Sequence, residues 1–337
     1  MVKIKVLNPV MPSNDRDPVG AGRKVLSAYR VIDGAIKSIY SGVAKRINDI
    51  PRTEVSVNDL NKATRKYIYE IDPMQMQDIS TFIQQLVNKE LLGNDTGLFS
   101  DLFFLNNGIE TEYIRATENA IQSTKNLASA NVVGSELSRQ IRAIETQNVL
   151  LSMGYQRRIG LAKSRVFEEM DGLTSAMKKD ISGILGRGMA AGHGVNRIKR
   201  EIRMALEGKD PEKSGGHKYR AERIARTEIN NAYRTAYQIE TDEVNNNVWK
   251  GTKFVTRLLW YSALAEGRTR KTHARRHGRV YTTTEVSNFY SIDGNAINCL
   301  CNQVSVLVRK KDGRVMNSEL IEEMKKQREM FVGGKGA

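Results

Sequence analysis

The sequence predicts an α+β protein: a mainly α-helical N-terminal two-thirds with long helices, followed by a small mixed α+β unit. Apolar residues recur at helical spacing up to about residue 250, and 110–185 contains no proline. From there on, β-branched and aromatic residues form short runs separated by turn residues, which is typical of strands. At roughly 100–200 residues per domain, a chain of 337 residues allows two domains or three.

The N-terminal part begins with a segment rich in Pro, Asp and Asn, 1–20, which we interpret as an extended arm. An amphipathic helix is expected over 21–48, because apolar side chains repeat there every three or four residues, and Pro51 ends it. The next segment, 59–72, is ambiguous. Its "YIYEID" could close a helix or form a short strand.

A second helix is expected from Pro73 to Gly93, since proline favours the first helical position and glycine the C-terminal cap. A loop follows, and it carries three aromatic residues that look exposed: Phe99, Phe103 and Phe104. Two interpretations stay open for them. They form local core beneath the loop, or they insert into a partner.

From 110 to 185 the pattern is almost entirely helical, with breaks indicated near 132–134 and 153–154. The glycines of 186–194 resemble a phosphate-binding loop. A dinucleotide fingerprint needs a strand before such a loop, however, and here a helix precedes it. We therefore expect a helix–turn–helix joint, with its second helix over 195–206.

Another helix is expected over 219–245. Beyond it, "TKFVTRLLWYSAL" and "RVYTT" indicate strands, and "NQVSVLVRKKDGRVMN" indicates a strand, a "KDG" turn and a second strand. A final amphipathic helix is expected over 318–330, with a free tail after it.

The chain carries a net charge of +15, which favours an anionic partner, although solubility alone would also account for it. No apolar run of about 18 residues is present, so we expect no transmembrane helix. No secretory signal is visible. The two cysteines, Cys299 and Cys301, are too few and too close for a disulfide framework, and we expect synthesis in a reducing cytosol.

A zinc site is one interpretation of the histidines and cysteines. His273 and His277 are four residues apart and would share a helix face, and two His with two Cys could satisfy zinc. Two features argue against it: six cations lie between Arg268 and Arg279, and structural zinc sites usually space their thiols by two to four residues. We expect no metal and no cofactor, with Cys299 and Cys301 acting as small buried side chains.

We also expect no enzyme activity, because no Ser/His/Asp set, Cys/His set or carboxylate pair stands out. A His-dependent nuclease would need an acid near its histidines, and only Glu266 is close. Residues 250–280 hold nine basic residues and one acid, a density that would position phosphates without reading sequence. The alternative is a solvated face, or a network of arginines that holds helices together.

The order of several short motifs is informative. "ARTEIN" at 225–230 opens a helix that continues "NAYRTAY", and a strand containing Trp260 follows. "RTR" begins at Arg268, with His273 and Gly278 after it, and "NCLC" at 298–301 precedes the last strand. Over about 175–310 this order resembles the MuF-like phage head morphogenesis family. That family has an "ARTE" helix, a Trp strand, "D-x-RT-R-x-x-H-x-x-x-x-G" and a closing "H-P-N-C-R-C".

The sequence departs from this pattern at a few positions. Glu266 replaces an Asp, His277 precedes Gly278 where the family often has Asp, and the closing His and Arg are missing. The resemblance implies that the matching positions are structural: Arg226, Thr227, Glu228, Trp260, Arg268, Thr269, His273, Gly278, Asn298, Cys299 and Cys301. Among them, Arg226, Glu228 and Arg268 are expected to tie helix to strands by charge-assisted hydrogen bonds. Five further cations are candidates for nucleic-acid contact: Arg270, Lys271, Arg275, Arg276 and Arg279.

The resemblance implies a minor head protein of a tailed phage, made in the host cytoplasm and placed in several copies inside the capsid near the portal vertex. It would contribute to head morphogenesis and genome packaging or ejection. Its expected partners are the portal protein, the major capsid protein or both, and packaged double-stranded DNA, with no membrane. The expected segments are a helical docking domain (21–185), a MuF-like domain (186–310) and a C-terminal end (311–337). The alternatives are a toxin-like or ADP-ribosyltransferase-like enzyme, and a plain cytoplasmic DNA-binding protein.

Overall fold

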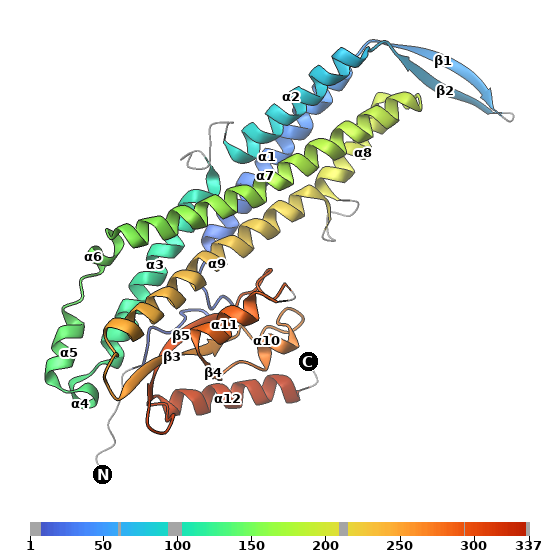
Figure 1. The fold of residues 1–337 in the computed structure, drawn as a ribbon. Helices are drawn as coiled ribbons and strands as arrows, with labels where there is room; N and C mark the ends of the chain where they lie inside the picture. Colours follow the sequence, from blue (N-terminus) through green and yellow to red (C-terminus); the bar gives the residue numbers. More distant parts are fainter. Residues whose placement is uncertain (1–7, 60–61, 94–102, 209–214, 293, 335–337) are drawn as a thin grey trace. The chain divides into compact units, whose positions relative to one another are not determined.

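The computed structural model describes residues 8–59, 62–93, 103–208, 215–292 and 294–334 (Figure 1). The helices are α1 (Gly22–Asn48), α2 (Pro73–Leu92), α3 (Phe104–Leu127), α4 (Ala130–Val133), α5 (Ser135–Arg142), α6 (Thr146–Leu150), α7 (Met153–Ala190), α8 (Val195–Glu207), α9 (Gly216–Asn247), α10 (Lys271–Ala274), α11 (Thr283–Tyr290) and α12 (Ser318–Gly333). The strands are β1 (Arg52–Asp59), β2 (Lys62–Tyr69), β3 (Phe254–Tyr261), β4 (Val280–Tyr281) and β5 (Asn302–Arg309). The α+β prediction is confirmed.

The described residues form two compact units, and each unit is assembled from separate stretches of chain. The first unit contains the residues up to Val25, then Gly108–Ile159, and all those from Thr227 onward. The second contains Leu26–Asn107 and Gly160–Arg226. Four helices, α1, α3, α7 and α9, supply residues to both. Neither unit follows the boundaries expected after residues 185 and 310, and the functional assignment of those segments stays a prediction.

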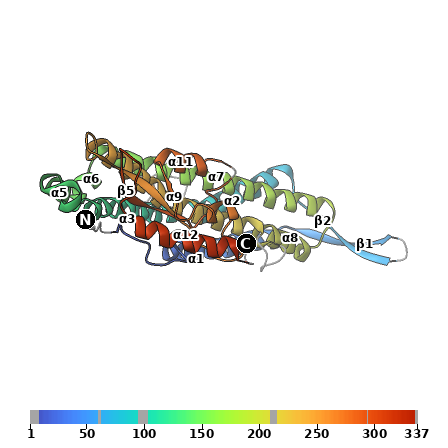
Figure 2. The same ribbon diagram turned by 90° about the horizontal axis from the view of Figure 1, so that it is seen from below.

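The first unit is built around a small antiparallel sheet in the order β4–β3–β5. One face of β5 contributes Val304, Val306 and Val308 to a core that α12 covers with Met324 (Figure 1 and Figure 2). Because side chains alternate along a strand, Leu307 faces the other way, into a cluster with Trp249. The sheet therefore has a packed core on both faces.

The N-terminal segment is not a free arm in its described part. Residues 8–20 contain no helix or strand, but they are held on the first unit by hydrogen bonds. The amide of Val10 donates to Ser123 Oγ at 3.0 Å, and Asn302 Nδ2 donates to the carbonyl of Pro18 at 2.9 Å. Tyr261 Oη donates to Asp15 at 2.6 Å. Side chains far along the sequence thus satisfy the backbone of this segment.

The second unit contains the middle parts of the long helices and a β-hairpin. Along α1, residues at helical spacing are fully buried, namely Ile32, Ile36, Ile39, Val43 and Ile47. The ambiguous segment forms β2, which pairs with β1, so the strand alternative is the correct one. In both views the hairpin extends beyond the end of α7 (Figure 1 and Figure 2).

The glycine-rich joint is a helix–turn–helix, as predicted. The turn between α7 and α8 holds the base of the hairpin: the carbonyl of Gly192 accepts from the amide of Tyr67 at 3.1 Å, and that of His193 accepts from Tyr69 Oη at 2.6 Å. Gly192 has φ +69°, and a Cβ there would lie 3.2 Å from the carbonyl oxygen of Tyr67. The joint therefore needs glycine for backbone geometry and for close approach.

Several other expectations need correction. Phe103 is 1% exposed and packs edge-on against Phe104 and Phe167, so the local-core interpretation is right for it; Phe99 lies outside the described residues. After β5, the expected second strand is reduced to one isolated bridge, Val308 with Val315. The short helices α10 and α11 were not predicted. Within the described ranges, no helix is both long enough and apolar enough to cross a membrane.

Candidate functional site

Helix α9 presents one face to the loop that carries both cysteines. Thr227 Oγ1 accepts from the amide of Asn298 at 3.1 Å, and the carbonyl of Cys299 accepts from Asn230 Nδ2 at 3.0 Å and from Arg234 Nη1 at 3.2 Å. Positions 227, 230 and 234 are three and four residues apart and so lie on one side of the helix. Asn298 has φ +54°, a left-handed conformation that these contacts hold in place. The motif "ARTEIN" at 225–230 was expected to open a helix but lies inside α9, which begins at Gly216. Helix α9 thus positions the "NCLC" loop.

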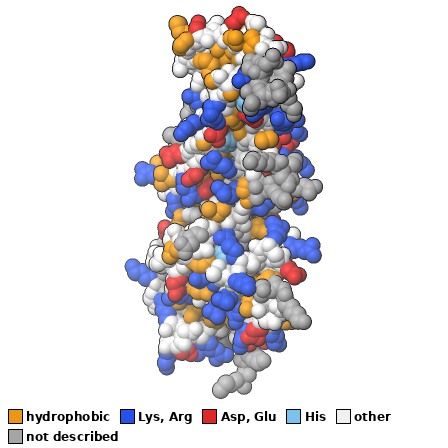
Figure 3. All heavy atoms as spheres, turned by 90° about the vertical axis from the view of Figure 1, so that its right-hand side faces the viewer, with side chains coloured by type: hydrophobic (Ala, Val, Ile, Leu, Met, Phe, Trp, Pro, Cys, Tyr) orange, Lys and Arg blue, Asp and Glu red, His pale blue; other side chains and the backbone are white. Residues whose placement is uncertain are grey.

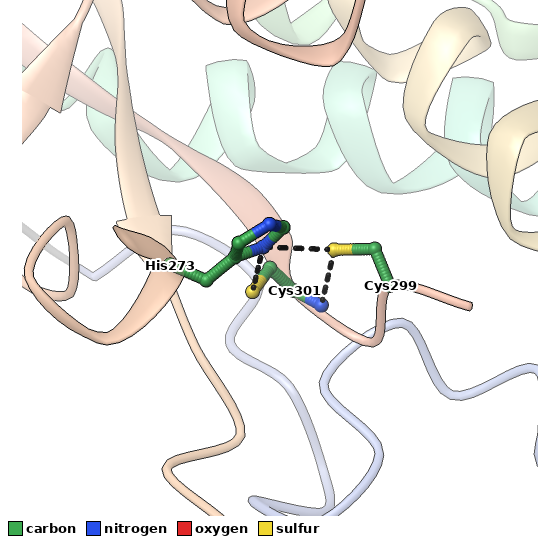
Figure 4. A group of neighbouring side chains, drawn as sticks. All are labelled: His273, Cys299 and Cys301. Carbon is green, nitrogen blue, oxygen red and sulfur yellow. Dashed lines mark hydrogen bonds between the residues drawn. The ribbon is translucent and has the colours of Figure 1, made fainter. Parts of the chain in front are cut away.

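The cysteine loop meets His273 in a buried cluster (Figure 4). His273 Nδ1 lies 3.4 Å from Cys299 Sγ and 3.4 Å from Cys301 Sγ. All three residues are less than 5% exposed, and their potential ligand atoms lie within 4.8 Å of one another. The amide of Cys301 also donates to Cys299 Sγ at 3.3 Å. The cluster joins α10 to the segment just before β5, which sequence analysis did not foresee.

Ser262 connects this cluster to strand β3. Its Oγ donates to the carbonyl of His273 at 2.8 Å and lies 3.1 Å from Cys301 Sγ. Trp260 Nε1 donates to Ser262 Oγ at 3.2 Å. The Trp260 ring also packs against Phe289 and Tyr290, at centroid distances of 5.0 and 5.2 Å. Trp260 of the predicted strand thus packs with two aromatic rings of α11 beside the cysteines and the histidine.

Arg234 brings a buried positive charge to the site. It is 2% exposed, its guanidinium carbon lies 4.5 Å from the centre of the Tyr290 ring, and Nη2 donates to Asn231 Oδ1 at 2.5 Å. Among the residues that the structure describes, no carboxylate forms an ion pair with it. The nearby groups able to carry negative charge are the phenol of Tyr290 and the two thiols.

The two thiols differ in their tendency to ionise. Burial raises the pKa of Cys299, but hydrogen bonding from Cys301, the charge of Arg234 and the contact with His273 outweigh it and hold that pKa well below the usual range. Burial, together with the hydrogen bond and the charge of Cys299, raises the pKa of Cys301 well above the usual range. The site therefore favours one thiolate, at Cys299, beside the guanidinium.

His277 does not join the cluster, so the interpretation in which His273 and His277 share one helix face does not hold. Helix α10 ends at Ala274, before His277. His277 Nδ1 accepts from the amide of Ser262 at 3.0 Å, and Nε2 lies 3.0 Å from Gln327 Oε1 on α12. Burial lowers its pKa, which favours the neutral ring that these two hydrogen bonds require.

Two further motif residues shape the turns around the site. Thr269 Oγ1 accepts from the amide of Ala265 at 2.9 Å. Gly278 has φ +72°, donates its amide to the carbonyl of Trp260 at 2.9 Å, and lies so close to α12 that a Cβ would be 2.9 Å from Met324 Cβ. Gly278 thus permits both a left-handed turn and the contact with α12.

The arginines are used differently from what was predicted. Arg268 is exposed, whereas Glu228 is buried. The expected tie between Arg268 and Glu228 stays a prediction. Arg226 belongs to the second unit, where its guanidinium carbon lies 5.3 Å from the centre of the Tyr29 ring. Two of the candidates for nucleic-acid contact, Arg270 and Arg276, instead make contacts within the protein. Arg270 donates to the carbonyls of 294, 295 and 297 at 3.0, 3.2 and 2.5 Å, and Arg276 lies 3.9 Å from the centre of the Phe289 ring.

Of the five candidates for nucleic-acid contact, Arg270 is exposed but donates to backbone carbonyls, and Lys271, Arg275 and Arg279 are the other exposed members. On the face drawn in Figure 3, Lys and Arg side chains are numerous but are interspersed with acidic and apolar ones rather than gathered in one patch.

Sequence analysis missed Ser262, Asn230, Arg234 and Tyr290 as parts of the site. Asn230 and Arg234 had a detectable signal, because they continue the spacing of Thr227 along the motif helix. Ser262 and Tyr290 had none. Their proximity to the cysteines depends on how β3 and α11 pack.

Comparison with known proteins gives one match. Residues 179–304 match the family model described as "Phage Mu protein F like protein". No curated protein and no solved structure matches the chain. The matched segment includes the glycine-rich joint, the whole of α9 and the cysteine loop.

Proposed function

Because residues 179–304 match the phage Mu protein F-like family, we propose that this protein is a minor head protein of a tailed bacteriophage that acts in head morphogenesis. The observation that carries the proposal is the family match over the segment in which α9 holds the cysteine loop through Thr227, Asn230 and Arg234. Its place is the interior of the capsid near the portal vertex, in several copies. Its role extends to packaging or ejection of the genome.

The partner in the head is the portal protein, the major capsid protein or both, bound through the helical part of the chain. Exposed apolar side chains supply candidate contact points. In the second unit, Ile68 on β2 is 59% exposed and Met74 at the start of α2 is 79% exposed. In the first unit, Leu151, which follows α6, and Met153, at the start of α7, are 74% and 71% exposed.

Deleting residues 1–185 would be a poor test of this docking, because residues 8–25 and 108–159 are part of the first unit. Their removal would take away part of the unit that contains the sheet and most of α9. Paired point substitutions avoid this problem. We expect Ile68→Ser with Met74→Ser, or Leu151→Ser with Met153→Ser, to reduce incorporation into heads in a complementation experiment. The control is Gln77→Ser, an exposed polar position on α2.

Quantification of the protein in purified heads decides the matter. If both double variants fold and are incorporated at the level of the control, docking through these apolar positions is wrong. If the parent protein itself is missing from heads, the proposed function is wrong.

Contact with packaged DNA is the second part of the proposal. It is supported by the net charge of +15 and by the exposed Lys271, Arg275 and Arg279. Replacing these three by Ala should lower the salt slope of DNA binding by roughly 0.9 for each phosphate that is no longer neutralised. The matched control replaces Lys250, Lys311 and Lys326, which are exposed elsewhere in the same unit and remove the same charge. If both triple variants lower the salt slope of DNA binding equally, the effect comes from net charge alone, and a specific contact through Lys271, Arg275 and Arg279 is wrong.

A further inference from the structure

We propose that His273, Cys299 and Cys301 form a metal site and that its ion is zinc. The proposal does not depend on a role in phage heads. It reverses the expectation drawn from sequence, and it does so because the structure regroups the residues. His277 is not among the possible ligands, because its Nδ1 accepts from the amide of Ser262. His273 directs one ring nitrogen, Nδ1, at both sulfurs.

The spacing of the three ligand atoms fits a tetrahedral ion. Zinc binds sulfur at about 2.3 Å and imidazole nitrogen at about 2.0–2.1 Å, so tetrahedral angles place nitrogen and sulfur about 3.5 Å apart. The distance from His273 Nδ1 to each sulfur is 3.4 Å. Zinc would therefore need little movement of these side chains.

The chemistry of the ligands selects the ion. Two thiols and an imidazole favour zinc or monovalent copper over magnesium or calcium, which require oxygen. His273 Nε2 is buried and has no hydrogen-bond partner in the described part of the chain. A proton on Nε2 leaves the lone pair of Nδ1 directed at the sulfurs, which is the tautomer that a metal ligand needs.

Both objections raised from the sequence lose their weight in the structure. The cations beside His273 do not point at the cluster, since Arg270 binds backbone carbonyls and Arg276 lies over Phe289. The short spacing of the cysteines is accommodated by the left-handed turn at Asn298, which α9 fixes.

The charges also match a metal-bound dithiolate. Two thiolates neutralise a divalent ion, and the guanidinium of Arg234 keeps its own partners, the carbonyl of Cys299, the amide of Asn231 and the ring of Tyr290. A nearby guanidinium favours the ionised form of a thiol, which is the form that binds metal. Three protein ligands leave a fourth position. Two oxygens lie close to the sulfurs: Tyr290 Oη, 3.6 Å from Cys299 Sγ, and Ser262 Oγ, 3.1 Å from Cys301 Sγ.

Such an ion would be structural. It would connect α10, which has only four residues, to the loop that leads into β5. Neither segment has a long hydrogen-bonded element of its own, so a shared ligand set would stabilise both.

The experiment measures metal bound to the full-length protein. The chain is purified without chelator, exposed to a small excess of zinc, desalted and analysed for zinc and copper. We expect about one zinc per chain. The variants Cys299→Ser and Cys301→Ser should lose it, whereas the control His277→Gln, also a buried histidine in the same unit, should keep it.

A second measurement covers the case in which the cysteine variants do not fold. Cobalt added to the chelator-treated parent should give the intense near-ultraviolet absorption of thiolate-to-cobalt charge transfer, and zinc should remove it. Absence of both zinc and this absorption in the folded parent would overturn the proposal and leave a metal-free thiol–imidazole cluster. Copper in place of zinc, or full zinc retention by a folded cysteine variant, would also overturn it.

Discussion

The two units of this protein bury different kinds of side chain. In the second unit, the buried polar or charged residues within the described ranges are Asn106, Thr174 and His217. All the other buried polar and charged side chains that the structure describes belong to the first unit. The second unit instead relies on apolar positions such as those of α1.

The difference has a physical reason in the backbone. Helices satisfy their own amides and carbonyls, so the helical second unit needs mainly an apolar face. The first unit contains irregular segments, such as 8–20 and the loop before β5, whose backbone groups must find side-chain partners when buried. A site with positioned thiols and an imidazole is therefore found in the unit rich in buried polar contacts.

The largest contrast between the units should come from ion pairs. In the first unit Arg158 pairs with Glu240 at 3.0 Å, and Glu240 is 5% exposed. Arg158→Met would leave a buried carboxylate without its partner, and we expect a loss of about 3–5 kcal/mol in the free energy of unfolding. Urea denaturation measures it. The control is Lys37→Met, which breaks the exposed pair with Asp33 in the second unit and should leave stability unchanged. Similar losses from both substitutions would remove the contrast.

Two glycines should respond to alanine with opposite signs. Gly278→Ala in the first unit places a Cβ at φ +72° and against Met324, and we expect a loss of about 1–3 kcal/mol. Gly172→Ala lies within α7, where a Cβ meets nothing within 4 Å, and we expect a gain of about 0.4–1 kcal/mol. Thermal unfolding of the two variants tests the signs. A stabilised Gly278→Ala protein would contradict the close packing of α12.

The stability of the second unit should fall when a single methylene is removed from the buried apolar face of α1. Ile36 on α1 is 1% exposed, and Ile36→Val should cost about 0.5–1.5 kcal/mol. Val31 on the same helix is 42% exposed, so Val31→Ala should have little effect on core packing. If the Val31 variant loses as much stability as the Ile36 variant, then α1 buries a different face.

The smallest expected effect is a pH dependence that arises in the second unit. Burial lowers the pKa of His217; hydrogen bonding to Asp180 and its charge oppose this, and Arg220 adds to the lowering. The folded state then binds fewer protons than the unfolded state below the ordinary His pKa of about 6.5. Its stabilising contribution is present above that pH and is lost as the pH falls toward the folded pKa. Urea denaturation at several pH values should give a steeper fall for the parent than for His217→Gln. Parallel curves would show that His217 does not contribute.

The sequence predicted the long helices, the joint near 186–194, strands β3 to β5 and the resemblance to the family whose model matches 179–304, because each depends on residues close together in the chain. Apolar spacing, caps and turn residues act locally, and so do the motif positions. It could not predict the hairpin β1–β2 from "YIYEID" alone, since a short apolar run fits a helix or a strand until its pairing partner is known.

What the sequence determined by itself was therefore the type of the long helices and of strands β3 to β5, and the order of the motif residues. Tertiary structure alone decided which side chains meet. It brought His273 to Cys299 and Cys301, separated it from His277, exposed Arg268, and directed Arg270 and Arg276 to carbonyls and aromatic rings. The reason is that these contacts join α9, α10 and the loop before β5, and distances between segments far apart in the chain are set by packing around the sheet.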